Sequence, residues 1–149
     1  MIEGVIIKKL AKNSDVRGWL IETFRRDEIE YAPAMEYVSQ TMPGVVRGPH
    51  EHQWQSDYFV FLAGKFKIYL WDNRLGAKNY RQRQVIEAGE DAPSAILVPP
   101  GVVHAYQCVS AGPGLVINMP DKLFKGENKA EAVDEIRWES AADSPFKID

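Results

Sequence analysis

The sequence predicts an all-β fold, a double-stranded jelly-roll barrel, on three observations. Short runs rich in β-branched and aromatic residues recur along the chain. Glycine and proline interrupt these runs at intervals typical of turns, and helical periodicity is weak. A chain of 149 residues with many short strands fits one such barrel, so we expect a single domain over residues 1–149.

The expected elements follow in chain order. Gly64 separates two apolar runs and predicts a hairpin turn. Short peripheral helical turns are expected near residues 27–31 and 128–133, since neither segment is long enough to define a layer. The barrel core is expected over about residues 36–118, with residues 119–149 packed over it as an irregular segment. Strands are expected at residues 5–7, 19–21, 58–62, 66–71, 95–98 and 114–117.

The composition excludes several classes of protein. The net charge is −3, from 18 Lys and Arg against 21 Asp and Glu, and no basic block suggests a nucleic acid or a membrane surface as partner. The apolar stretches are too short to span a bilayer, and the first residues lack the pattern of a signal peptide. Cys108 is the only cysteine, so no intrachain disulfide can form. We therefore expect a cytoplasmic protein.

The three histidines of the chain are the strongest functional signal. His50 and His52 lie two residues apart, so they project to the same side of an extended strand. His104 follows a Pro-Pro-Gly turn that leads into another β-like run. We expect all three imidazoles to share one site.

Two segments around these histidines resemble the two sequence motifs of the cupin superfamily. Asp57 stands where cupins usually have Glu, and Cys108 where they usually have Asn. The resemblance implies a small jelly-roll barrel with its site in the barrel mouth. The matching positions are Gly44, His50, His52, Asp57 and Gly64 in the first motif, and Pro99, Gly101 and His104 in the second.

A metal site is one interpretation of this pattern. Three imidazoles and a carboxylate suit a divalent transition metal, since imidazole is a ligand of intermediate softness. The ligands would be His50, His52, Asp57 and His104. The function on this alternative is that of a metal-dependent cupin enzyme acting on another small polar molecule.

Longer stretches resemble the dTDP-4-dehydrorhamnose 3,5-epimerase family of deoxysugar synthesis. The resemblance implies a nucleotide-sugar epimerase or isomerase, an enzyme that moves protons next to the ketone of a dTDP-4-keto-6-deoxysugar, with no cofactor as the first choice. It also implies a homodimer, in which residues 5–7 could add an edge strand to the partner. Four segments carry the resemblance: Asp15-x-Arg17-Gly-Trp-x-x-Glu22, Gly44-Val-Val-Arg47-Gly-x-His50, Trp71-Asp-x-Arg74 and Pro99-x-Gly-x-x-His104.

The resemblance also implies roles for individual residues. Epimerisation next to a ketone needs a base, stabilisation of the enolate and an acid on the opposite face. The family's base falls on His50 and its second active-site histidine on His104. Its arginines near the diphosphate fall on Arg17 and Arg47, whose guanidinium groups suit phosphate oxygens. Glu22, in the first matching segment, is a further candidate for substrate binding.

Three departures from the family pattern bear on activity. His52 replaces a glutamine, and Asp57 replaces the active-site lysine, both in the direction of a metal site. The tyrosine that serves the family as acid has no counterpart in residues 118–124. Tyr106 is the expected replacement acid and Tyr58 an expected substrate contact, because both lie beside site residues. Loss of the acid leaves a non-catalytic nucleotide-sugar binding protein as an alternative.

The sequence does not identify the carboxylate that orients the base. Asp72, Asp143 and Glu22 are all available in the sequence.

Overall fold

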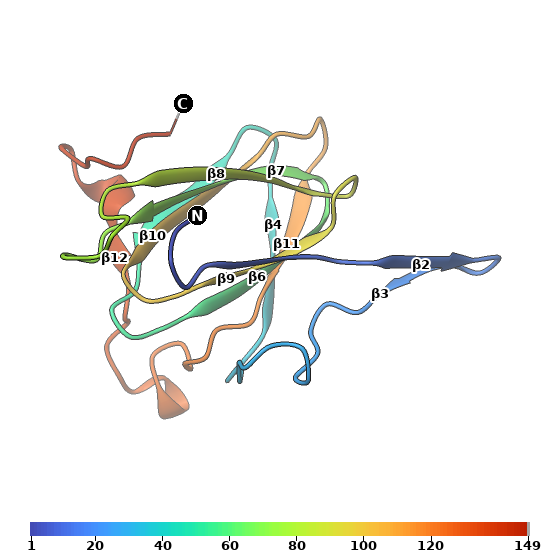
Figure 1. The fold of residues 1–149 in the computed structure, drawn as a ribbon, viewed down its shortest axis with the longest axis horizontal. Helices are drawn as coiled ribbons and strands as arrows, with labels where there is room; N and C mark the ends of the chain where they lie inside the picture. Colours follow the sequence, from blue (N-terminus) through green and yellow to red (C-terminus); the bar gives the residue numbers. More distant parts are fainter. Residues whose placement is uncertain (149) are drawn as a thin grey trace.

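The computed structural model describes residues 1–148, and they form two five-stranded antiparallel sheets that enclose a common core (Figure 1). The predicted all-β jelly roll is confirmed. The first sheet has the order β1 (Ile6–Lys9), β9 (Ser94–Val98), β6 (Asp57–Ala63), β11 (Gly114–Asn118) and β4 (Tyr37–Thr41). The second has the order β12 (Ile136–Arg137), β5 (Val46–Glu51), β10 (Val102–Cys108), β7 (Lys65–Asp72) and β8 (Arg83–Gly89).

Alternation along β6 shows how the core is built. Phe59 and Phe61 point between the sheets and pack in the central apolar cluster with residues of β7, β9, β10 and β11. Tyr58 and Val60 point to the outer face, where residues of the 21–31 segment cover them. Both faces of this strand are therefore buried, which explains its continuous apolar run.

The C-terminal segment covers the outer face of the second sheet. Phe146 and Trp138 pack against the outward-facing side chains of β7 and β10. The segment is more regular than expected, because it contains β12 and two 3₁₀ turns, Glu127–Lys129 and Trp138–Ser140. The first of these turns falls in the expected region, whereas the helical turn expected near residues 27–31 is a non-helical turn.

The predicted hairpin at Gly64 joins β6 to β7. Gly64 has φ +81°, and a Cβ there would lie 2.6 Å from the Cα of Gly114. Only glycine allows both the left-handed backbone and this close approach.

A second hairpin, formed by β2 (Lys12–Asp15) and β3 (Gly18–Ile21), projects away from the barrel (Figure 1). Its exposed side chains include Val16, Trp19 and Leu20. Residues 6 and 7 of the run at residues 5–7 belong to β1, which pairs with β9 on one side and forms an edge of the first sheet.

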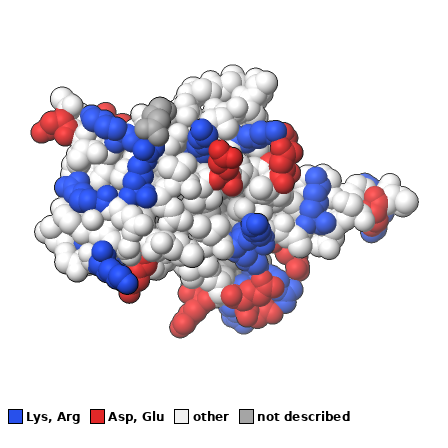
Figure 2. Space-filling model, turned by 45° about the horizontal axis from the view of Figure 1, so that its top comes forward, with Lys and Arg blue, Asp and Glu red and all other residues white. Residues whose placement is uncertain are grey.

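Charged side chains of both signs occur together on the face seen in Figure 2, including the projecting arm. This distribution agrees with the small net charge of −3. Within residues 1–148, no helix is long and apolar enough to cross a membrane.

Candidate active site

A cavity of about 1540 Å³ opens between the two sheets. Strands of both sheets line it, and so do residues of the segment after β11. Its strand-borne polar and aromatic residues are Tyr37 and Ser39 of β4, Arg47 and His50 of β5, Asp57 and Phe59 of β6, His104 and Tyr106 of β10, and Arg137 of β12.

A β-bulge turns two residues of β5 toward this cavity. His50 pairs with His104 and Arg47 with Tyr106, so β5 has one more residue than β10 between the two pairs. Gly48 lies in the bulge with φ +88°, and a Cβ there would lie 2.6 Å from the carbonyl oxygen of His104. The glycine of the Arg-Gly-x-His segment is therefore required by the close approach of β5 to β10.

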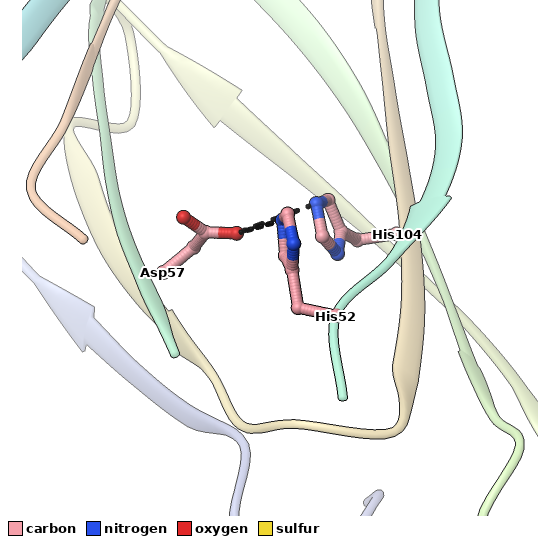
Figure 3. Close-up of side chains that lie close together, drawn as sticks. All are labelled: His52, Asp57 and His104. Atoms are coloured by element: carbon pink, nitrogen blue, oxygen red, sulfur yellow. Dashed lines mark ion pairs between the residues drawn. The ribbon is translucent and has the colours of Figure 1, made fainter. Parts of the chain in front are cut away.

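His52, Asp57 and His104, which all line the cavity, have their side chains directed toward one another (Figure 3). Oδ2 of Asp57 lies 3.0 Å from Nε2 of His52 and 3.6 Å from Nε2 of His104. Oδ1 of Asp57 accepts hydrogen bonds from the side-chain amides of Gln55 (3.0 Å) and Asn118 (2.8 Å). The buried carboxylate is thus surrounded by donors.

The hydrogen bonds of His52 determine its charge. Nδ1 lies against the carbonyl oxygen of Asp134, which can only accept, so Nδ1 carries a proton. Burial acts to lower the pKa of His52, but the hydrogen bond to Asp57 and its charge outweigh burial and raise that pKa to about 9. Burial likewise acts to raise the pKa of Asp57, and the hydrogen bond from His52 brings it below its usual value. At neutral pH this is an imidazolium–carboxylate pair.

His104 is in the opposite state. Burial lowers its pKa to about 4, against the attraction of Asp57. Nδ1 of His104 lies 3.3 Å from the carbonyl oxygen of Val102. The two histidines beside Asp57 therefore differ in charge at neutral pH.

His50 is held by carboxylates from the C-terminal segment. Its Nε2 lies 2.7 Å from Oε1 of Glu139, and its Nδ1 lies 3.5 Å from Oε1 of Glu135. The pairing of β12 with β5, in which Arg137 lies opposite His50, brings both glutamates to this ring. Since a carboxylate accepts, Nε2 carries the proton and Nδ1 is the nitrogen left to accept one.

The carboxylate paired with His50 is therefore Glu139, which was not among the candidates Asp72, Asp143 and Glu22. Asp72 instead pairs with Arg74, and Glu22 pairs with Arg25. Glu139 lies 89 residues after His50 and is brought to it by β12, a strand of only two residues. Such a short strand gives no periodic signal, so the sequence did not indicate Glu139.

The structure brings together four of the seven predicted catalytic and substrate-binding residues: His50, His104, Tyr106 and Arg47. Arg17 and Glu22 lie outside the cavity of their own chain. The Arg17 side chain is 86% exposed on the projecting hairpin and pairs with Asp15.

Tyr58 does not contact the cavity, and the expectation that it does is corrected. Its neighbour Asp57 points inward, so Tyr58 must point to the other face of β6. Its hydroxyl donates to the carbonyl oxygen of Thr23, and its ring packs against Phe24 and Tyr31.

The structure reduces the expected set of four metal ligands to three. His52, Asp57 and His104 offer ligand atoms within 4.8 Å of one another and could hold a divalent cation. His50, expected as a fourth ligand, lies outside this group because its ring is engaged by Glu139. Oδ2 of Asp57 already accepts from His52, so the buried carboxylate is satisfied without a cation.

Comparison with known proteins decides the family. The family model for dTDP-4-dehydrorhamnose 3,5-epimerase matches residues 1–142. The chain belongs to this family. It is 35% identical over 133 residues to the probable low-salt glycan biosynthesis epimerase Agl13 of Haloferax volcanii, covering 87% of this chain and 85% of Agl13.

Solved structures share the fold of this epimerase family member. The dTDP sugar isomerase of Desulfovibrio desulfuricans matches with a TM-score of 0.85 at 20% identity, over 98% of this chain and 91% of that one. The epimerase of Legionella pneumophila in complex with dTDP-4-keto-L-rhamnose matches with a TM-score of 0.79 at 20% identity, over 99% and 81%. The family supports a nucleotide-sugar epimerase or isomerase function, and the metal-dependent and binding-only alternatives are not favoured.

Besides Glu139, two further residues of this epimerase site were not identified as site residues from the sequence. Tyr37 lines the cavity, and its hydroxyl accepts a hydrogen bond of 2.9 Å from the side-chain amide of Asn118. Asn118 lies in the region where the family has its tyrosine, but it is only 2% exposed and points inward. The pairing of β11 with β4 places Asn118 directly opposite Tyr37, a relation that only the sheet register reveals.

Proposed function

We propose that this protein epimerises a dTDP-4-keto-6-deoxysugar by proton transfer at a carbon next to the ketone, with His50 as the base. The observation that carries the proposal is the His50–Glu139 pair, which lines the cavity of a member of this epimerase family. An imidazole held by a carboxylate has the proton affinity and the orientation that such a base needs.

The proton transfer follows from the hydrogen bonds of His50. Nε2 donates to Glu139, so Nδ1 takes the proton from the sugar carbon. The imidazolium that forms is stabilised by Glu139 and by Glu135, 3.5 Å from Nδ1. His52 supplies a positive charge near Asp57, where the family has its lysine, and Asp57 keeps His52 protonated. We propose that this chemistry uses no metal.

Arg47 is proposed to bind the diphosphate. The bulge in β5 places it on the cavity wall beside His50. Its Nε donates to the hydroxyl of Thr41 (3.0 Å) and one terminal nitrogen donates to the carbonyl of Gln40 (2.7 Å), which fixes the guanidinium group. The other N–H groups of the fork suit phosphate oxygens.

The projecting β2–β3 hairpin supports a homodimer. A two-stranded hairpin is marginal in water on its own, and this one exposes Val16, Trp19 and Leu20. We propose that it packs on a second copy of the chain, where Arg17 and Glu22 would reach the substrate of that copy. Light scattering should give the mass of a dimer, and the change Trp19→Asp with Leu20→Asp should give a monomer. A monomeric unmodified protein would contradict the proposal.

We also propose that the protein is cytoplasmic. The substrate is tested by incubation with dTDP-4-keto-6-deoxyglucose in D₂O. Deuterium should enter at C3, at C5 or at both, and an epimer should form. No deuterium at either carbon would overturn this substrate and this chemistry.

A further inference from the structure

A tyrosine hydroxyl lies on the sheet opposite the base. Tyr37 belongs to β4 of the first sheet, whereas His50 belongs to β5 of the second, and both line the cavity. Epimerisation requires that the proton return to the carbon from the face opposite the base. A sugar ring held between the two sheets would present one face to each residue.

The hydrogen bonds around Tyr37 leave its proton free. Asn118 uses one amide N–H for Oδ1 of Asp57 (2.8 Å) and the other for the hydroxyl oxygen of Tyr37 (2.9 Å). The charge of Asp57 fixes this orientation, because the amide oxygen of Asn118 would be repelled there. The hydroxyl oxygen of Tyr37 therefore accepts, and its own O–H remains to be donated into the cavity.

The hydrogen bond from Asn118 also suits Tyr37 to act as an acid during turnover. Burial raises the pKa of Tyr37 to about 12, so the hydroxyl is protonated before the reaction. The N–H of Asn118 stabilises the phenolate that remains once the proton has left. Asn118 is buried and held by Asp57, so it need not reorganise in the reaction.

Tyr106, the acid expected from the sequence, is less suited to this role. It comes from β10, in the same sheet as His50, and is 7% exposed, whereas Tyr37 is 45% exposed. Its ring packs against Phe59 and Phe61, and its hydroxyl lies 3.2 Å from the hydroxyl of Ser39. These contacts describe a side chain fixed in the core.

We propose that Tyr37 is the proton donor of this site, from β4 rather than from residues 118–124, the region where the family has its tyrosine. The assignment rests on the proposed function. His50 removes the proton, and the electrons of the broken C–H bond form the enolate. When the enolate returns to the ketone, the carbon takes the proton of Tyr37 from the opposite face. The phenolate and the His50 imidazolium then recover their resting states by proton exchange with water.

The test compares Tyr37→Phe with the unchanged protein on dTDP-4-keto-6-deoxyglucose in D₂O. Without the acid, epimer formation should fall by roughly 10²- to 10⁴-fold. Deuterium should still enter the substrate with its configuration retained, because His50 can remove a proton and return a deuteron to the same face. Tyr80→Phe, at an exposed position that does not line the cavity, is the matched control and should behave as the unchanged protein.

The outcomes separate this assignment from the proposed function. Equal epimer formation by Tyr37→Phe and the unchanged protein would overturn the assignment alone. Loss of both deuterium exchange and epimer formation in a Tyr37→Phe protein with a normal melting temperature would also overturn it. The same holds if Tyr106→Phe, and not Tyr37→Phe, keeps exchange but loses epimer formation. An unchanged protein that exchanges no deuterium would overturn the proposed function and the assignment with it.

Discussion

Nε2 of His50 lies 2.7 Å from Oε1 of Glu139, although 89 residues separate the two in the chain. The pair couples the C-terminal segment to the proposed base. It also accounts for the function of β12, which contributes only two residues to its sheet but positions the carboxylate.

Glu139→Gln should lower kcat by about tenfold to a hundredfold, because a hydrogen bond to a charged group is worth about 1.5–3 kcal/mol. KM should change little, since Glu139 acts through His50. Steady-state kinetics check this, with Glu135→Gln as the comparison variant. Glu135 lies 3.5 Å from the ring, so its change should cost less. An unchanged kcat in Glu139→Gln would exclude the orienting role.

Gly48→Ala should destabilise the fold by about 2 kcal/mol or more and lower activity, because the added Cβ meets the backbone of β10 in a left-handed conformation. Urea unfolding measures the difference in free energy. Gly112→Ala is the control, since nothing lies within 4 Å of a Cβ there and its φ is not positive. Equal stabilities of the two variants would refute the close approach of β5 to β10.

The stability of the fold should depend on pH through His52. The pKa of His52 rises from 6.5 when unfolded to about 9 when folded, so its contribution is complete below pH 6.5 and is lost as the pH rises through 9. The loss can reach about 1.4 kcal/mol per pH unit between these values. Urea unfolding at pH 6.5 and 8.5 measures it. His52→Gln should lose less stability over this interval, and equal losses would contradict the ion pair with Asp57.

The lowered pKa of His104 affects the stability of the fold at acidic pH. It is lowered from 6.5 to about 4 in the folded protein, so protonation of the unfolded chain removes stability as the pH falls below 6.5. The combined contribution of His52 and His104 to the free energy of unfolding is therefore greatest near pH 6.5.

The purified protein should contain no stoichiometric transition metal, and a chelator should leave its activity unchanged. Asp57 already pairs with the imidazolium of His52, so a cation would have to displace that proton. Elemental analysis checks this. One metal ion per chain that disappears in His52→Ala would favour the metal alternative instead.

Alternation in an extended strand predicted that His50 and His52 project to the same side, and the cupin resemblance added Asp57 and His104. In the structure His52, Asp57 and His104 meet, whereas His50 lies outside this group and pairs with Glu139. Alternation, applied to Asp57, would have excluded Tyr58 from the cavity. The resemblance to the epimerase family depended on four segments, which lie in the β2–β3 hairpin, in β5, at the end of β7 and at the start of β10, and the family match confirms it.

The remaining site residues depend on pairings that local patterns do not encode. Glu139 reaches His50 only through β12, and Tyr37 reaches Asn118 only through the register of β4 and β11. Arg17 was identified from its motif, but its position on a projecting hairpin depends on how the hairpin leaves the barrel. Long-range strand pairing therefore marks the limit of the sequence prediction.

The most direct test of the central claim is the rate at which deuterium enters dTDP-4-keto-6-deoxyglucose, measured by proton NMR for His50→Gln and His52→Gln side by side. His50→Gln should lose exchange almost completely, whereas His52→Gln, which restores the family's residue, should retain measurable exchange. Exchange at the normal rate in a folded His50→Gln protein would show that another group is the base.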